Sequence, residues 1–170
     1  MPAISGRTAV APPEDHRDRL RRERIIRLSA LSYDAKRLEA ACVQLGLTLL
    51  VAYGSRAGAS YEPRPDSDLD LALSLPGPRG WSRLSDCLRA LGEVFPDYSL
   101  DAVFLSDADP LFRWEIMRDG LLLHGDPIEF LEYRAFAYKD FVDSAGLRRV
   151  EAALFRKRMD WIREQLHAAA

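Results

Sequence analysis

The chain has 170 residues, the length of about one globular domain, and a hydrophobic content of 48% beside 29% charged residues is ordinary for a chain that buries a core. Basic and acidic residues nearly balance, 24 against 26, so the formal net charge of −2 argues against a protein that binds nucleic acid through overall charge. No apolar run approaches a membrane span, and no signal-type apolar segment stands near the N-terminus. We expect a cytoplasmic protein with no membrane partner and no direct nucleic-acid partner.

The first 31 residues fall into two parts. Residues 1–13 are rich in Ala, Pro, Gly, Ser and Thr without periodicity, which predicts a disordered arm. Residues 14–31 are arginine-rich, with acidic residues four positions before Arg19, Arg22 and Arg27. That spacing predicts a solvated helix rather than a nucleic-acid patch.

Strand-like and helix-like segments then alternate. Continuous apolar runs predict strands over 47–53, 69–75, 100–105 and 121–124, and helical periodicity predicts helices over 34–45, 82–95 and 110–119. The order predicts an α/β (α+β) core over residues 32–126, a small mixed sheet flanked by helices. Cys42 and Cys87 fall on helical patterns without ligand spacing, so we expect free, buried thiols in a reducing compartment.

The last segment, residues 127–170, has helical periodicity almost throughout, and we expect C-terminal helices that pack on the core. Its aromatic residues and a later apolar series have the spacing of buried helix faces. The aromatic residues are Phe130, Tyr133, Phe136, Tyr138 and Phe141. The later series is Phe155, Met159, Ile162 and Leu166.

The segment between the first two strands carries the chemistry. The first strand runs into Gly54-Ser55, where glycine lets the backbone turn tightly toward an anion. The residues that follow can open a helix whose N–H groups face a phosphate, and Ser55 adds a hydroxyl donor. This turn is a candidate phosphate-binding element.

Three aspartates begin the next two strands. Asp68 and Asp70 stand two positions apart at the start of the second strand, so their carboxylates point the same way. Asp101 stands near the beginning of the third strand. Gathered carboxylates repel each other unless a cation lies between them, and Mg²⁺ prefers oxygen ligands. An acidic turn facing water is the alternative, but the ordered combination with Gly54-Ser55 favours a metal-dependent phosphate site.

These residues resemble a known family. Gly54-Ser55-Arg56 followed by Ser67-Asp68-Leu69-Asp70-Leu71 is similar to the glycine-serine and Asp-x-Asp motif of the DNA polymerase β-like nucleotidyltransferase superfamily. Within it, the small size resembles the minimal nucleotidyltransferase (MNT) antitoxins of the MntA type, which are paired with HEPN toxins. The strand that begins at Asp101 and the segment 110–125 are similar to that group's third-aspartate strand and the helix and strand after it.

Two features depart from the antitoxin pattern. Twelve residues separate Ser55 from Asp68, where ten are usual, and a count of ten would make Asp66 and Asp68 the pair. We favour Asp68 and Asp70 because Leu69 and Leu71 continue directly into the strand and a loop absorbs extra length cheaply. Gly58 stands where many relatives have a second arginine, which leaves Arg56 as the local candidate for a phosphate contact.

The resemblance implies transfer of AMP from ATP to an acceptor hydroxyl. Asp68, Asp70 and Asp101 would hold two Mg²⁺ ions, Asp101 would also act as general base, and Gly54, Ser55 and Arg56 would bind the nucleotide. The implied acceptor is a tyrosine of a cognate HEPN ribonuclease toxin. Two alternatives stay open: a small-molecule enzyme acting on an aminoglycoside-like hydroxyl, and an antitoxin that acts by binding alone.

Other residues have weaker signals. We expect Tyr53 and Trp114 in the core and His124 in a structural role. Arg113, Arg134 and Lys139 are equally compatible with phosphate or partner contacts and with solvated helix faces.

Overall fold

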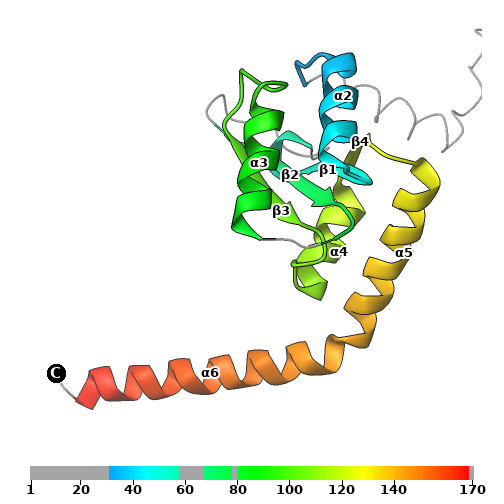
Figure 1. Ribbon diagram of the computed structural model, residues 1–170. Helices are drawn as coiled ribbons and strands as arrows, with labels where there is room; N and C mark the ends of the chain where they lie inside the picture. The colour runs from blue at the N-terminus through cyan, green and yellow to red at the C-terminus, as the bar shows by residue number, and fades with distance from the viewer. Residues whose placement is uncertain (1–30, 58–66, 78–79, 169–170) are drawn as a thin grey trace, which may run out of the picture.

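The computed structural model describes residues 31–57, 67–77 and 80–168 (Figure 1). The predicted arm and nearly all of the predicted arginine-rich helix lie outside these ranges, as does Asp66. Within the described ranges, no helix is both long enough and apolar enough to cross a membrane.

A four-stranded mixed sheet forms the centre of the molecule. Its strands are β1 (Leu49–Tyr53), β2 (Leu69–Ser74), β3 (Leu100–Phe104) and β4 (Leu121–His124), in the spatial order β3-β2-β1-β4. β1 is antiparallel to both of its neighbours, whereas β2 and β3 run parallel. The four strands and the mixed sheet predicted from sequence are confirmed.

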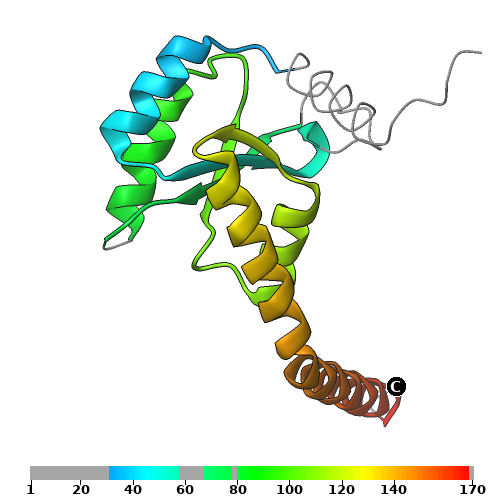
Figure 2. The same ribbon diagram turned by 90° about the vertical axis from the view of Figure 1, so that its right-hand side faces the viewer.

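The helices lie on both faces of this sheet (Figures 1 and 2). α2 (Ala35–Leu45) and α3 (Trp81–Gly92) pack on one face through a core that includes Leu50, Leu71 and Leu91. Cys42 and Cys87 are free and buried in that core, as predicted. α4 (Pro110–Asp119) and α5 (Pro127–Asp143) cover the opposite face.

Local sequence signals explain where the helices begin. The Asp34 carboxylate accepts hydrogen bonds from the first N–H groups of α2, and Asp109 does the same for α4, with Pro110 in the first turn. Asp126 and Pro127 repeat this arrangement at α5. A side-chain acceptor before the helix and a proline without an N–H suit these positions because the first backbone donors have no partner within the helix.

Several boundaries differ from the sequence prediction by one to three residues: α3, for example, ends at Gly92 rather than at residue 95. The start of β1 has a clear physical reason. β1 begins at Leu49 rather than at residue 47, because the chain first has to close α2. Gly46 adopts a left-handed conformation with φ of 65°, and the N–H of Leu47 donates to the Cys42 carbonyl at 2.9 Å. Leu47 is therefore part of the helix cap although it is as apolar as the strand.

The two C-terminal helices differ in their surroundings. α5 contributes the buried residues Phe130 and Ala137 to the core beneath it. α6 (Ala145–Ala168) projects away from the sheet and has its main contacts with α5 (Figures 1 and 2). The expectation of buried aromatic and apolar faces holds for Phe130 but is wrong for Phe155 and Leu166, which are 66% and 67% exposed.

Candidate active site

The sheet register places Asp70 and Asp101 side by side. Asp70 is the second residue of β2 and Asp101 the second residue of β3, and the parallel register pairs them directly. Ala72 lies two residues after Asp70 in the core beneath α4 and α5, so both carboxylates project from the sheet face that these helices cover. The aspartates that the sequence separates by about thirty positions therefore meet at one edge of the sheet.

The carboxylates of Asp68, Asp70 and Asp101 repel one another. Burial raises the pKa of the half-buried Asp70 carboxyl, and the neighbouring carboxylates of Asp101 and Asp68 raise it further. Asp68, just before β2, and Asp101 are exposed. A bound cation would relieve this repulsion and favour the ionised form of Asp70.

Gly54 lies against the Asp70 carboxylate. Its φ of +72° lies in the left-handed region, and a β-carbon built on it would overlap Asp70 Oδ2 and lie 3.0 Å from Cγ. Glycine is thus required here twice, for the backbone conformation and for the close approach of the carboxylate. The two sequence motifs lie next to each other because β1 and β2 are adjacent and antiparallel.

Gly54–Arg56 forms a 3-10 turn at the end of β1, closed by a hydrogen bond from the Ala57 N–H to the Gly54 carbonyl. Ser55 is half-buried in this turn, next to the glycine that touches Asp70. The turn therefore lies beside the carboxylates, although it does not continue into an α-helix within the described residues.

Arg56 makes contacts that tie two parts of the chain together. Its Nε donates to the Ser67 carbonyl at 2.6 Å, and its guanidinium lies 4.9 Å from the centre of the Tyr98 ring. It thereby holds the segment that leads into Asp68 and Asp70. The nucleotide contact predicted for Arg56 stays a prediction, and the structure adds this positioning role.

Tyr53 belongs to the site, although its sequence context suggested only a core residue. It lies opposite Asp70 in the β1–β2 register, and its ring contacts Phe112 edge-on with centroids 5.6 Å apart. Burial raises its pKa to about 12, with further contributions from Asp70 and Asp101. The phenol is therefore neutral at physiological pH and can donate a hydrogen bond beside the carboxylates. The sequence signal that could have placed Tyr53 beside the carboxylates is its position immediately before Gly54.

The carboxylates fit a cation that the nucleotide helps to bind. In the described part of the chain, no three His, Cys, Asp or Glu side chains form a group that could hold a metal ion. Mg²⁺ usually binds one or two carboxylates together with water and substrate phosphates, rather than a complete protein cage. Asp70 and Asp101 supply such a pair, with the turn at Gly54 beside them.

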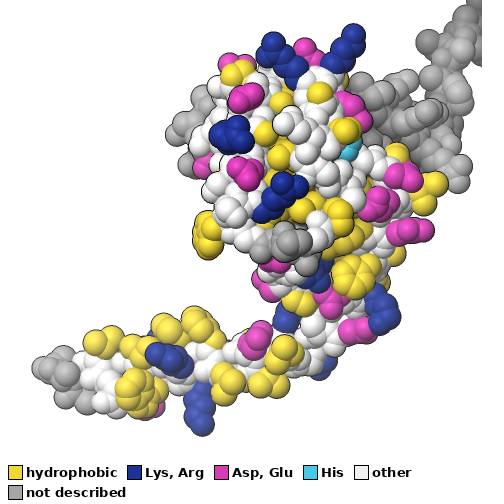
Figure 3. Space-filling view, viewed as in Figure 1, with side chains coloured by type: hydrophobic (Ala, Val, Ile, Leu, Met, Phe, Trp, Pro, Cys, Tyr) yellow, Lys and Arg dark blue, Asp and Glu magenta, His cyan; other side chains and the backbone are white. Residues whose placement is uncertain are grey.

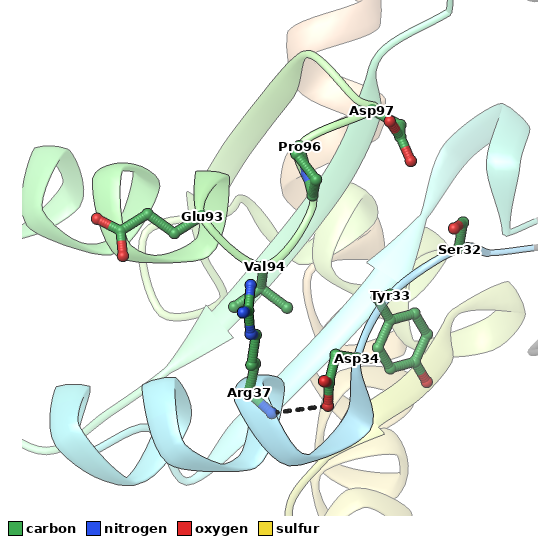
Figure 4. A pocket seen from close by; sticks show the side chains of 8 residues that line it. All are labelled: Ser32, Tyr33, Asp34, Arg37, Glu93, Val94, Pro96 and Asp97. Atoms are coloured by element: carbon green, nitrogen blue, oxygen red, sulfur yellow. Dashed lines mark hydrogen bonds between the residues drawn. The ribbon is translucent and has the colours of Figure 1, made fainter.

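A polar hollow of about 350 Å³ lies on the α2–α3 side of the molecule (Figure 4). It is separate from the aspartates, because Tyr33 and Val94 in its wall belong to the core on the other face of the sheet. The Asp34 carboxylate there accepts the N–H of Arg37 at 3.1 Å and thus serves as a helix cap. The lining residues are Ser32, Tyr33, Asp34, Arg37, Glu93, Val94, Pro96 and Asp97.

Comparison with known sequences identifies one family match. Residues 39–128, slightly more than half of the chain, match the family described as polymerase beta, nucleotidyltransferase. The match includes the turn at Gly54 and all three aspartates. None of the proteins with a curated description matches the chain.

Solved structures share the fold. A chain in a crystal structure of a mutant of the toxin-antitoxin MntA-HpeT aligns with a TM-score of 0.58 at 14% identity, over 74% of this chain and 98% of that one. A chain in a toxin-antitoxin structure with AMP-PNP gives the same TM-score and coverage at 16% identity. A third, from a tri-AMPylated Shewanella oneidensis HEPN toxin in complex with MNT antitoxin, gives 0.52 at 16% identity, over 74% and 99%. At these identities the likeness is one of fold.

Proposed function

Because this chain belongs to the polymerase β nucleotidyltransferase family, we propose that it transfers AMP from ATP to a tyrosine hydroxyl of a cognate HEPN ribonuclease toxin. It would thereby act as the antitoxin that silences this toxin. The observation that carries the proposal is the direct pairing of Asp70 with Asp101 beside the turn at Gly54. That arrangement combines a cation-binding pair with a backbone turn suited to phosphate.

Each residue has a distinct task in this reaction. Asp68, Asp70 and Asp101 would hold two Mg²⁺ ions, which supply charge neutralisation for the attacking and leaving oxygens. Asp101, exposed at the start of β3, accepts the proton of the acceptor hydroxyl. The hydroxyl oxygen forms a bond to the α-phosphorus while the bond to the bridging oxygen breaks, and pyrophosphate leaves with the electron pair.

The turn after β1 orients the triphosphate. Backbone N–H groups after Gly54 and the Ser55 hydroxyl would donate to the phosphate oxygens. Arg56 holds the segment before β2 through the Ser67 carbonyl, so it keeps Asp68 and Asp70 in place relative to the turn. The rate would then come mainly from positioning and from neutralising charge.

A protein acceptor is favoured over a small molecule. A small-molecule pocket encloses most of its ligand and needs walls around the reacting atoms. The last helix, the largest element after the family match, runs away from the sheet instead of covering the carboxylates (Figure 1). The structural neighbours named as complexes of HEPN toxin and MNT antitoxin agree with a protein acceptor.

The proposal is tested by incubating the purified chain with ATP, Mg²⁺ and the cognate HEPN protein, taken as the helical product of the adjacent gene, and measuring that product's intact mass. We expect a gain of one or more AMP units, and a rate at least about 100-fold lower for Asp70→Asn. The matched control is Asp86→Asn, on the exposed side of α3, which should transfer at the wild-type rate. Binding of the two proteins without any mass gain would overturn AMP transfer in favour of inhibition by binding.

A further inference from the structure

The last helix exposes its whole length. α6 has 24 residues, about 36 Å at 1.5 Å per residue, and none of its described side chains, on residues 145–166, is buried. Large apolar residues remain in water along it, among them Leu154 at 62%, Phe155 at 66% and Trp161 at 60% exposure. Figure 3 shows hydrophobic side chains exposed along this helix. Helices in proteins take most of their stability from packing an apolar face, and the described residues supply no such packing for α6 beyond its junction with α5.

The apolar residues of α6 form two stripes rather than one. At 100° per residue the stripes lie roughly 120° apart around the helix axis. Polar residues at seven-residue spacing separate them: Glu151, Arg158 and Gln165. The first stripe is Leu147, Val150, Leu154 and Trp161. The second stripe is Phe155, Met159, Ile162 and Leu166. Two stripes with a polar ridge between them suit a helix that lies in the groove between two partner helices.

The charge of α6 indicates the sign of its partner. The helix carries six arginines and lysines and three acidic residues. Two copies of α6 packed together would bring basic residues against basic residues. The chain's own first 30 residues, with seven arginines and four acidic residues, have the same sign. An acidic partner surface therefore complements α6 better than either of these.

The direction of α6 is held at its junction with α5. The Ser144 hydroxyl donates to the Asp140 carbonyl at 2.6 Å, and the Arg148 guanidinium contacts the Ser144 hydroxyl and lies 4.0 Å from the centre of the Phe141 ring. α5 in turn covers the sheet face from which Asp70 and Asp101 project. A partner held along α6 is thus attached on the side of the molecule that carries the carboxylates.

We propose that α6 is the docking helix for the protein acceptor. It lies between two helices of that acceptor, with its two apolar stripes buried and its basic residues against acidic rims. The identity of the partner rests on the proposed function, whereas the binding role of α6 rests on the exposed stripes and their charge.

The test measures binding of full-length protein to the purified HEPN protein by calorimetry, without ATP or Mg²⁺, so that no transfer takes place. Leu154→Ala/Trp161→Ala should raise Kd by about 100-fold or more, since a buried tryptophan is a typical hot spot and the neighbouring leucine of the same stripe loses its apolar burial with it. Alanine favours helix and neither residue packs on the core, so the variant keeps its fold. The control, Arg149→Ala/Asp160→Ala on the opposite side of α6, should change Kd by less than about threefold.

Charge and kinetics give independent readouts. Lys157→Glu/Arg163→Glu should also raise Kd, and the wild-type Kd should rise with salt, because the partner surface is acidic. In transfer assays Leu154→Ala/Trp161→Ala should raise KM for the acceptor and leave kcat at saturation unchanged. A purely structural loss would lower kcat as well.

The outcomes separate the two proposals. An unchanged Kd for Leu154→Ala/Trp161→Ala, or no binding by the wild type, overturns the docking role of α6. A wild-type dimer in light scattering that this variant abolishes also overturns it, since α6 then binds a second copy. Binding through α6 without AMP transfer supports docking and refutes the proposed reaction. Transfer with unchanged KM in the variant refutes docking alone.

Discussion

Gly54 and the Asp70 carboxylate share a space that admits no additional atom. We expect Gly54→Ala to displace Asp70 and to abolish nucleotide transfer, because the new β-carbon would overlap Oδ2. The left-handed φ of 72° adds a stability cost of about 1–2 kcal/mol. Transfer rates and urea unfolding of the same preparations check both effects.

Gly46→Ala is the matched control for this substitution. Gly46 has a similar φ of 65°, at the end of α2, but a β-carbon there would meet no atom within 4 Å. It should therefore show the same cost of about 1–2 kcal/mol while transfer continues at the wild-type rate. Wild-type transfer by Gly54→Ala would contradict the close approach of Asp70.

In the absence of a bound cation, the ionised carboxylate of Asp70 lowers the free energy of unfolding. Its pKa is raised in the folded state, so its protonated form stabilises the fold at pH values below the unfolded pKa, and this contribution is lost as the pH rises through the folded pKa. Asp70→Asn cannot ionise, so we expect its advantage in free energy of unfolding over the wild type to grow from pH 4 upward and then level off. Urea unfolding between pH 4 and pH 8, with Asp86→Asn as control, measures this difference.

Mg²⁺ with a non-hydrolysable ATP analogue should reverse the ranking at neutral pH. The ligands bind the folded wild type and raise its unfolding midpoint, whereas Asp70→Asn lacks a metal-binding carboxylate and should gain much less. Removal of Mg²⁺ by chelation should restore the original order. An equal rise in both proteins would mean that Asp70 does not contact the cation.

At the scale of elements, helices and strands could be predicted where local sequence determines them. The caps at Asp34, Asp109 and Asp126 and the buried run of β1 depend on local spacing, and the predicted helices and strands are confirmed on that basis. The Asp70–Asp101 pairing depends on the register of β2 and β3, which no local pattern specifies. The sequence places the three aspartates near the starts of two strands, and only the fold shows that Asp70 and Asp101 lie side by side.

Arg113 illustrates a role that spacing could not reveal. Sequence left it between a phosphate or partner contact and a solvated face, but its side chain is only 12% exposed and turned inward. It donates to the carbonyls of Leu105, Ser106 and Ala108 and to the Asp140 carboxylate, at 2.6 to 3.1 Å. One guanidinium thereby connects the end of β3, the start of α4 and the last turn of α5.

We expect Arg113→Ala to destabilise the protein by about 2–4 kcal/mol, because three carbonyls and a partly buried carboxylate lose their donor. Arg113→Lys should recover little of this, since an ammonium cannot reproduce the forked geometry. The control is Arg118→Ala on the exposed side of α4, where the pair with Asp119 lies in water and should contribute less than about 0.5 kcal/mol. Urea unfolding compares the three, and a loss equal to that of Arg118→Ala would contradict the connecting role.

At the scale of the whole molecule, the sequence predicts that a helix has an apolar face but does not show which element packs against that face. The spacing of Phe155, Met159, Ile162 and Leu166 correctly predicted a helix with an apolar stripe. The stripe is exposed because α6 leaves the core at Ser144, a change of direction that periodicity does not encode. An apolar stripe is evidence for a contact, and the partner in that contact need not belong to the same chain.

Hydrogen exchange should show a difference in local stability between the core and the last helix. A single helix of 24 residues without packing opens readily, so amides over 150–165 should exchange at least about 100-fold faster than those of β1, which is almost fully buried. Mass spectrometry on the full chain, repeated at a tenfold lower protein concentration, provides the control for self-association. Equally slow exchange in α6 and β1 would mean that the helix is packed in the free protein, and dependence of that protection on concentration would identify a second copy as its cover.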